Sequence, residues 1–273
     1  VGKRVGAAST VAYSTDSGTS WLSGAVGSDP GEDLKDVTVL SATVAIAVGK
    51  ANGAASPILH TTDSGANWSV LSLADDPGED LEKVAANGGT TVIAIGMSGS
   101  FVRSTDSGAT WSNPIQPGPA ALLNGIAASG NTVIAVGNQA GNSNIIFSTD
   151  QGSTWLTGTV AADPLQNLNA VAVLSATDAV AVGQSVAPPA STILRTIDSG
   201  LNWTVQAVTG DPGRDLLAVA TSGGTGIAVG LNAGGTSTVL RSTDSGVSWN
   251  LQAVTLDPGQ QLNAVAFSTS ANV

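Results

Sequence analysis

The sequence contains no cysteine, so neither a disulfide framework nor a thiolate metal site is available to it. Basic residues are also scarce, because nine Lys and Arg stand against 20 Asp and Glu and give a formal net charge of −11. Such a chain lacks the positive field that phosphate backbones attract, which excludes nucleic acid as an expected partner. The sequence also has no run of eighteen apolar residues, and we therefore expect no membrane insertion.

Charged residues of both signs make up only 11% of the chain, while small residues such as Gly are abundant. This composition is typical of secreted and surface β-proteins, and it favours an extracellular or cell-surface location. It also suits a subunit that packs into a larger assembly, so self-assembly is a further expectation.

An eight-residue pattern, Ser/Thr-x-Asp-x-Gly-x-x-Trp, occurs six times and includes every tryptophan of the chain. We call it the Asp box. Successive boxes begin 43 to 48 residues apart, which is the period of one four-stranded blade in a β-propeller. The boxes are Ser14–Trp21, Thr61–Trp68, Ser104–Trp111, Ser148–Trp155, Thr196–Trp203 and Ser242–Trp249.

Each repeat has the same predicted strands. In a first strand such as 168–173 and a second such as 179–183, the side chains alternate with the period of two that a β-sheet requires. A third strand leads into the box, and a fourth begins at the box Trp. Asp-Pro-Gly turns, as at Asp29 and Asp211, then lead to the next repeat. The sequence therefore predicts an all-β fold, a single six-bladed propeller of four-stranded antiparallel blades over residues 1–273.

The two ends of the chain together have the length of one repeat. Leu262–Phe267 has the pattern of a first strand, and Val1–Gly2 matches the end of a second strand. We therefore expect the N- and C-termini to share one blade, which non-covalent pairing would seal. The join is slightly shorter than the other repeats, so the alternative that the chain is an excerpt from a longer array stays open.

The boxes resemble the bacterial neuraminidase repeat, which sialidases, some xyloglucan-cleaving enzymes, sortilin-type receptors and the photosystem II assembly-factor family share. The strands around them, such as Leu216–Val219, Ile227–Gly230 and Val239–Gly246, are most similar to the last of these groups. This resemblance covers the whole chain and implies a propeller that acts as a binding scaffold. The assembly-factor family is expected to use a basic surface and seven blades, whereas this chain has five arginines and six repeats, so its partner is not transferred.

We assign the box residues a structural role. Each box Asp would accept hydrogen bonds from the N–H groups of a turn, each Gly would supply a backbone angle that other residues resist, and each Trp would bury apolar surface beside the turn. These residues are Asp16, Gly18, Trp21, Asp63, Gly65, Trp68, Asp106, Gly108, Trp111, Asp150, Gly152, Trp155, Asp198, Gly200, Trp203, Asp244, Gly246 and Trp249.

Sialidase chemistry is not expected. By resemblance it would need a Tyr–Glu nucleophile pair and an arginine triad, yet the single tyrosine directly precedes a box. Very different side chains occupy that place in the six repeats, and this variety indicates a peripheral surface position on strand three. They are Tyr13, His60, Arg103, Phe147, Arg195 and Arg241. His60 has no second histidine for a metal pair and is interpreted as an ordinary exposed side chain.

Most of the acidic residues that remain lie in or beside the Asp-Pro-Gly turns, at the ends of the blades opposite the boxes. We expect this acidic face to bind a basic protein partner or a hard cation such as Ca2+, which carboxylate oxygens suit. No other cofactor is expected. The candidate residues are Asp29, Glu32, Asp33, Asp76, Glu79, Asp80, Asp211, Asp215 and Asp257.

Two functions follow from this pattern. The first is a non-enzymatic binding or structural propeller that recognises a protein, a glycan or a neighbouring subunit through one loop face. The alternative is a glycoside hydrolase-like enzyme that uses two carboxylates of the acidic face.

Overall fold

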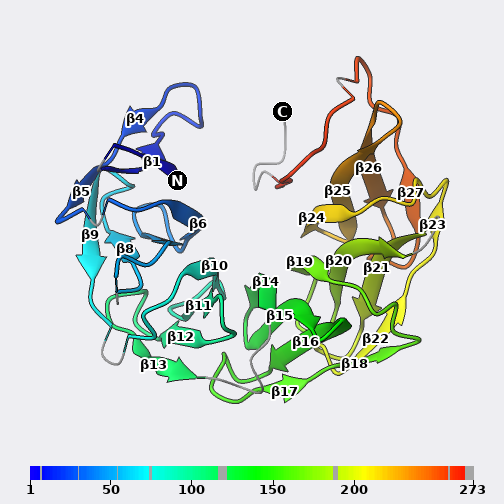
Figure 1. The fold of residues 1–273 in the computed structure, drawn as a ribbon, viewed down its shortest axis with the longest axis horizontal. Helices are drawn as coiled ribbons and strands as arrows, with labels where there is room; N and C mark the ends of the chain where they lie inside the picture. The colour runs from blue at the N-terminus through cyan, green and yellow to red at the C-terminus, as the bar shows by residue number, and fades with distance from the viewer. Residues whose placement is uncertain are drawn as a thin grey trace. The chain divides into compact units, whose positions relative to one another are not determined.

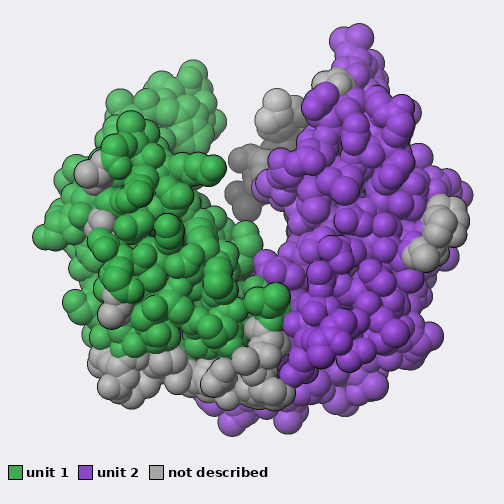
Figure 2. All heavy atoms as spheres, in the orientation of Figure 1, with its two compact units in different colours: residues 1–123 green, residues 124–273 purple. Residues whose placement is uncertain are grey.

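The computed structural model describes all residues except 7, 30, 54, 74, 75, 116–121, 187–189, 258 and 268–273. The described residues form β-strands and turns without a helix, which confirms the predicted all-β class (Figure 1). Accordingly, this part of the chain holds no helix of the length and apolarity that crossing a membrane requires. The chain divides into two compact units, residues 1–123 and 124–273, which we describe separately (Figure 2).

Unit 1 contains two hairpins, a five-stranded sheet and a four-stranded sheet. The hairpins join β1 (Gly2–Val5) to β2 (Ala8–Thr10) and β3 (Ala12–Tyr13) to β4 (Leu22–Ser23). The five-stranded sheet comprises β5 (Ala25–Gly27), β6 (Leu34–Val39), β7 (Ala45–Gly49), β8 (Ile58–Thr61) and β9 (Asn67–Leu71), in the order β5-β9-β8-β7-β6. The four-stranded sheet runs through β10 (Leu81–Ala86), β11 (Val92–Gly96), β12 (Phe101–Ser104) and β13 (Ser112–Ile115).

Unit 2 contains one four-stranded and two five-stranded sheets. The first has β14 (Leu122–Ser129), which begins within unit 1, β15 (Thr132–Gln139), β16 (Asn142–Ser148) and β17 (Leu156–Thr157). The second has the order β18-β22-β21-β20-β19, with β18 (Thr159–Ala161), β19 (Leu168–Val173), β20 (Ala179–Val186), β21 (Ala190–Thr196) and β22 (Asn202–Val205). The third has the order β23-β27-β26-β25-β24, with β23 (Val208–Thr209), β24 (Leu216–Ser222), β25 (Thr225–Ala233), β26 (Thr236–Ser242) and β27 (Trp249–Leu251).

The fifth strand of these sheets comes from the preceding repeat. After β4 pairs with β3, the chain passes Gly24 and continues as β5, which pairs in parallel with β9 of the next sheet. The segments β17–β18 and β22–β23 make the same crossing to β22 and β27. At Gly24 a Cβ atom would lie 2.5 Å from the Gly65 carbonyl oxygen, and Gly158 lies equally close to Gly200, whereas Gln206 takes this place in the third crossing. At these three places the chain that follows strand four therefore joins two neighbouring sheets.

Strand two contains a glycine where the turn that leads into strand one passes close to it. In β25, a Cβ on Gly230 would lie 2.0 Å from the Asp215 carbonyl oxygen, which instead accepts the N–H of Leu231 at 2.9 Å. The register between β24 and β25 shifts at this point, as a β-bulge requires. Gly49 and Gly183 have the same close contacts.

The core of each unit lies between neighbouring sheets. Strand two of one sheet faces strand one of the next, as Val180 and Val182 of β20 join Val219 of β24 in one apolar cluster. The box Trp of the second sheet completes this cluster, and Trp203 and Trp249 are fully buried. The box is therefore both a turn and part of the packing between blades.

The first repeat lacks this packing in the described structure. Its box Trp21 is 64% exposed, whereas Trp68 and Trp111 in unit 1 are at most 8% exposed. The described part of this repeat consists of the β1–β2 and β3–β4 hairpins, and Leu262–Phe267 carries no strand. Residues 268–273 lie outside the described residues. The sharing of one blade by the two termini therefore stays a prediction.

Candidate functional site

The six Asp boxes form one hydrogen-bonded turn, repeated with little change. In each, the Asp Oδ1 atom accepts the backbone N–H of the residue four positions later, over 2.8 to 3.0 Å. The Ser or Thr hydroxyl that opens the box donates to the same carboxylate and accepts the N–H of the box Gly. Five box Trp side chains donate their indole N–H to that Gly carbonyl oxygen.

These contacts hold the box carboxylates in the ionised form. Side-chain and backbone donors lower the pKa of Asp16, Asp106, Asp150 and Asp244 to about 2, and the pKa values of Asp63 and Asp198 are also lowered. The residue between Asp and Gly and the Gly itself both have positive φ, as at Ser199 (64°) and Gly200 (105°). The box carboxylates therefore stabilise the turn through these hydrogen bonds.

The acidic face predicted from the sequence lies at the other end of the strands, which we call the loop end. It comprises the turns from strand four to strand one and the hairpins from strand two to strand three. Four turn aspartates there accept the N–H of a Ser twenty residues earlier, at the start of strand three, over 2.7 to 2.9 Å. Each also accepts the N–H two residues later at 2.8 Å. These pairs are Ser9–Asp29, Ser56–Asp76, Ser191–Asp211 and Ser237–Asp257.

A second set of carboxylates lies four residues after three of these turn aspartates. Asp33, Asp80 and Asp215 accept the backbone N–H of Arg4, Ala51 and Ser185, over 2.8 to 2.9 Å. They therefore tie the entry of strand one to the hairpin that follows strand two. In three repeats the predicted acidic residues thus support the turn as a pair, Asp29 with Asp33, Asp76 with Asp80 and Asp211 with Asp215, whereas Asp257 has no such second carboxylate.

The glutamates of the loop end are paired as well. Glu32 lies 3.7 Å from the Arg4 guanidinium, and Glu79 accepts the N–H of Ser98 at 2.7 Å and the Ser100 hydroxyl. Lys35 on β6 bridges Asp80, at 2.7 Å, and Glu82 on the next sheet. The acidic charge of the loop end in unit 1 is thus partly balanced by cations within hydrogen-bonding or ion-pair distance.

Within the described residues, no group of three or more His, Cys, Asp or Glu side chains could hold a metal ion. Ca2+ takes six to eight oxygen ligands, whereas the carboxylates here are separated into pairs that already accept N–H groups. The described residues therefore do not form a cluster of ligands for the cation that the sequence suggested, and Ca2+ binding stays a prediction.

Sequence reasoning missed Asp36, the third residue of β6. Its carboxylate accepts the N–H of Val84 on the neighbouring β10 at 3.0 Å, and burial raises the pKa of this carboxyl, an effect that the charge of Lys83 opposes. The alternating pattern of a strand gave no signal for this contact, because the partner is a backbone group of the next repeat.

The position directly before each box is less peripheral than we predicted, because Phe147 is buried and the others, except the exposed Arg241, are half-buried. Phe147 is only 3% exposed, and its Cβ would lie 2.9 Å from a Cβ placed on Gly200 of the next box. Tyr13 lies similarly against Gly65, and the Arg195 Nε atom donates to the Ser245 carbonyl oxygen at 2.7 Å. Because the box Gly has no side chain, the space beside it accommodates the varied side chains that precede the boxes.

His60 occupies this position against Gly108 and is half-buried, contrary to the exposed side chain that the sequence suggested. Its Nε2 atom is buried without a hydrogen-bond partner. Burial lowers the pKa of His60 below 6.5, although the nearby charge of Asp106 works in the opposite direction. The folded chain therefore keeps this imidazole neutral at pH values where the unfolded chain binds a proton.

We expect His60→Phe to reduce the loss of stability between pH 7 and pH 5.5. The lowered pKa means that the His60 contribution is complete above pH 6.5 and is lost as the pH falls below it. Phe147 shows that Phe fits the equivalent position. Thermal melts of both proteins at several pH values test this, and equal pH dependence of the two melting temperatures would contradict it.

The comparisons with known proteins concern the fold. No curated protein matches the chain. Among solved structures, YCF48 bound to D1 peptide has a TM-score of 0.50 and 16% identity, with 80% of this chain and 82% of that one covered. The GH74 enzyme of Niastella koreensis has a TM-score of 0.64 and 14% identity, with 93% of this chain and 46% of that one covered. The Nidogen/Laminin complex has a TM-score of 0.55 and 10% identity, covering 85% and 84%.

The chain thus spans less than half of the GH74 enzymes that it matches, among them the GH74 xyloglucanase from Xanthomonas campestris at 38% of its length. At these identities the likeness concerns the fold alone. A family model described as the DUF6242 beta propeller domain matches residues 20–272, nearly the whole chain, and so confirms the predicted propeller. The protein is therefore a member of the DUF6242 β-propeller domain family.

Proposed function

We propose that this chain is a non-enzymatic binding propeller that recognises a protein partner through the loop end of its blades. One observation supports this above the others: the carboxylates that the hydrolase alternative would use already accept backbone N–H groups or pair with Arg4 and Lys35. A residue engaged as a turn support is poorly placed to act as a nucleophile or a proton donor. The loop end instead offers a stiff frame for exposed loop residues.

The likeness to GH74 propellers favours a second candidate, a glycoside hydrolase. That reaction would need two carboxyl groups roughly 5 to 10 Å apart across a sugar-binding cleft. Among three cavities found within the described residues, one contains a carboxylate in its lining. It lies between Asn52 and Asp76 and has a volume of about 150 Å³. That carboxylate is Asp76, which accepts the N–H of Ser56 and of Gly78.

Two further features belong to the proposal. The repeated hydrogen-bond pattern of the boxes supports membership of the neuraminidase-repeat superfamily. The low content of charged side chains supports an extracellular or surface-associated setting, where a protein or glycan partner or a second copy of the chain would meet the loop end. YCF48, which has been solved bound to D1 peptide, is an example of a protein of this fold with a peptide ligand.

The enzymatic alternative is tested by incubating the full chain with xyloglucan and with sialyllactose and measuring released sugar. We expect no release above the rate of the buffer alone. Release by the wild-type chain that disappears in an Asp76→Asn variant with an unchanged melting temperature would establish a hydrolase and overturn the proposal.

The binding surface is tested with exposed residues at opposite ends of the blades. Lys50 and Arg214 lie at the loop end, and Thr62 lies in a box. In extracts of the source organism, a partner identified with the wild-type chain should be retained by Thr62→Glu and lost by Lys50→Glu or Arg214→Glu. Loss of the partner in Thr62→Glu alone would place the binding surface at the boxes instead.

A further inference from the structure

His60 and Arg195 occupy the same position in two different repeats. Each comes directly before an Asp box on strand three, and each lies beside the box Gly of the following repeat. A Cβ atom on Gly108 would lie 3.8 Å from His60 Cδ2, and a Cβ atom on Gly246 would lie 3.7 Å from Arg195 Cδ. We call these two contacts the His60 joint, in unit 1, and the Arg195 joint, in unit 2. Both joints hold a side chain that can carry a positive charge.

The Arg195 joint supplies partners for its cation. The Arg195 Nε atom donates to the Ser245 carbonyl oxygen at 2.7 Å, and an Nη atom lies 3.1 Å from the Asp178 carboxylate. Asp178 belongs to the hairpin between strands one and two, where its carbonyl oxygen accepts the N–H of Leu174 at 2.8 Å. A charged side chain is thus held in this joint by a carbonyl oxygen and a carboxylate.

The His60 joint lacks the matching carboxylate. In its hairpin the Val44 carbonyl oxygen accepts the N–H of Leu40 at 2.9 Å, so Val44 occupies the place that Asp178 has in the later repeat. The His60 Nε2 atom is buried and has no hydrogen-bond partner among the described residues. A neutral ring fits this place, as the buried Phe147 does in its own repeat, whereas an imidazolium would be buried without a partner.

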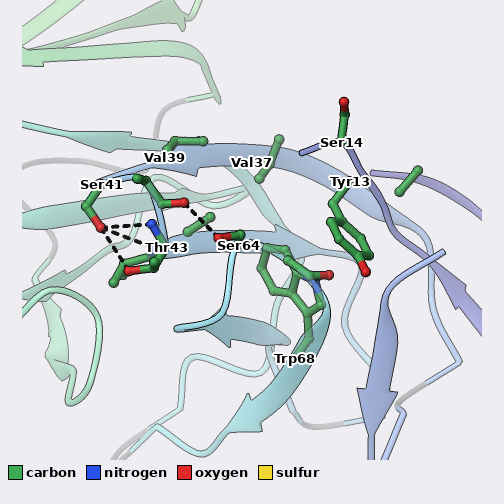
Figure 3. A pocket seen from close by; sticks show the side chains of 13 residues that line it. Tyr13, Ser14, Val37, Val39, Ser41, Thr43, Ser64 and Trp68 are labelled. Carbon is green, nitrogen blue, oxygen red and sulfur yellow. Dashed lines mark hydrogen bonds between the residues drawn. The ribbon is translucent and has the colours of Figure 1, made fainter. Parts of the chain in front are cut away.

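The polar groups of this hairpin are used within the hairpin and the box beside it. Figure 3 shows the hairpin where it lines a cavity of about 290 Å³. The Ser41 hydroxyl accepts the N–H of Thr43 and of Val44, and the Ser64 hydroxyl donates to the Ala42 carbonyl oxygen. Residues 40–44 contain no titratable side chain. The hairpin therefore offers no charge to a protonated His60.

A single carboxylate faces His60 from the other elements packed against it. Strands β7 and β9 carry no titratable side chain, and the box 104–111 carries Asp106 alone. That carboxylate already accepts the Ser104 hydroxyl and both the N–H and the hydroxyl of Thr110, over 2.6 to 2.8 Å. The lowered pKa of His60 agrees with this arrangement, because burial outweighs the attraction of Asp106.

We propose that protonation of His60 opens the His60 joint, so that the contact between the β5–β9 sheet and the β10–β13 sheet in unit 1 responds to pH. The imidazolium leaves its buried place because water solvates it better than the joint does. The box 104–111 then separates from Ile46, and Trp111, which packs in the same cluster as Ile46, becomes exposed. The Arg195 joint stays closed, because an arginine keeps its charge and its partners.

Hydroxyl-radical footprinting of the full chain at pH 7.5 and pH 5.5, read by mass spectrometry, tests this inference. Oxidation of Trp111 should rise by about fivefold at the lower pH, as local opening exposes the indole. Trp249, the box Trp of the Arg195 joint, is the internal control and should change by less than about twofold. An unchanged Trp111, or an equal rise for both side chains, would overturn the inference.

Two variants show whether His60 causes the opening. His60→Phe removes the titrating group, and Val44→Asp supplies the carboxylate that Asp178 supplies in unit 2. Each variant that melts cooperatively at pH 7.5 should keep Trp111 protected at pH 5.5. A rise in Trp111 oxidation in His60→Phe equal to that of the wild-type chain would assign the opening to another group and overturn the inference.

Val39→Asp is the matched control for the added charge, because Val39 is 69% exposed in unit 1. This variant should open at pH 5.5 as the wild-type chain does. A joint that stays closed in Val39→Asp would assign the effect of Val44→Asp to net charge and contradict the role of a carboxylate at this place. The inference goes beyond the proposed function, which is tested separately at the loop end and survives either result.

Discussion

Trp203→Ala should destabilise the protein strongly. Trp203 is fully buried between two sheets of unit 2, where it packs with Phe147 and Leu168 and donates its indole N–H to the Gly200 carbonyl oxygen at 2.8 Å. Removing such a side chain leaves a cavity as well as lost apolar contacts, and we expect a loss of about 3 to 5 kcal/mol in the free energy of unfolding. Urea denaturation followed by circular dichroism would measure it.

Trp21→Ala is the matched control, because it changes the same residue in the same motif. Trp21 is 64% exposed, so its truncation should cost less than about 1 kcal/mol, as surface substitutions usually do. Equal losses for the two variants would show that Trp21 is buried in solution. The comparison therefore separates the effect of the motif from the effect of its packing.

Gly230→Ala should also disrupt folding. The added Cβ would lie 2.0 Å from the carbonyl oxygen of Asp215, and that atom belongs to the backbone and cannot rotate away. The turn would have to move and give up the 2.9 Å hydrogen bond from Leu231, so we expect a loss of about 3 kcal/mol, at the upper end of the usual range for overpacking. The melting temperature and the urea midpoint both measure this effect.

Gly89→Ala provides the control for that change. Its Cβ would approach only the Asn87 Oδ1 atom, at 3.4 Å, and its φ lies outside the left-handed region. We expect this variant to unfold within about 0.5 kcal/mol of the wild-type chain. A similar loss in both variants would show that the close contact at Gly230 is not the cause of the destabilisation.

The sequence predicted those features that depend on neighbours along the chain. The box pattern predicts its own turn, because all its partners lie within seven residues, and the spacing of Leu168–Val173 and Ala179–Gly183 predicts two strands. The Ser–Asp pairs of the loop end also had a visible signal, a constant spacing of twenty residues between Ser191 and Asp211 and their equivalents. This constant spacing would have predicted the hydrogen bond between the turn Asp and the backbone of the Ser.

Other features depend on packing between repeats and had no local signal. The burial of a side chain such as Phe147 before its box was not predicted, because its contact, the box Gly200 of the next repeat, lies about fifty residues away. The crossing of strand four was missed for the same reason, since β5 is three residues long and its partner β9 belongs to the next repeat. The same holds for the candidate site. The sequence identified its acidic residues, but their hydrogen bonds from the backbone N–H groups of the turns are visible only in the structure.

The crossing of strand four also bears on how such a chain grows in evolution. Where this crossing occurs, a repeat gives a short tail to its successor, as β17–β18 and β22–β23 do, and the repeat that contains β22 also receives one. A duplicated repeat inserted between two others would meet compatible joints on both sides. Gene duplication can therefore lengthen the array one repeat at a time, while a break placed inside strand four would damage two repeats at once.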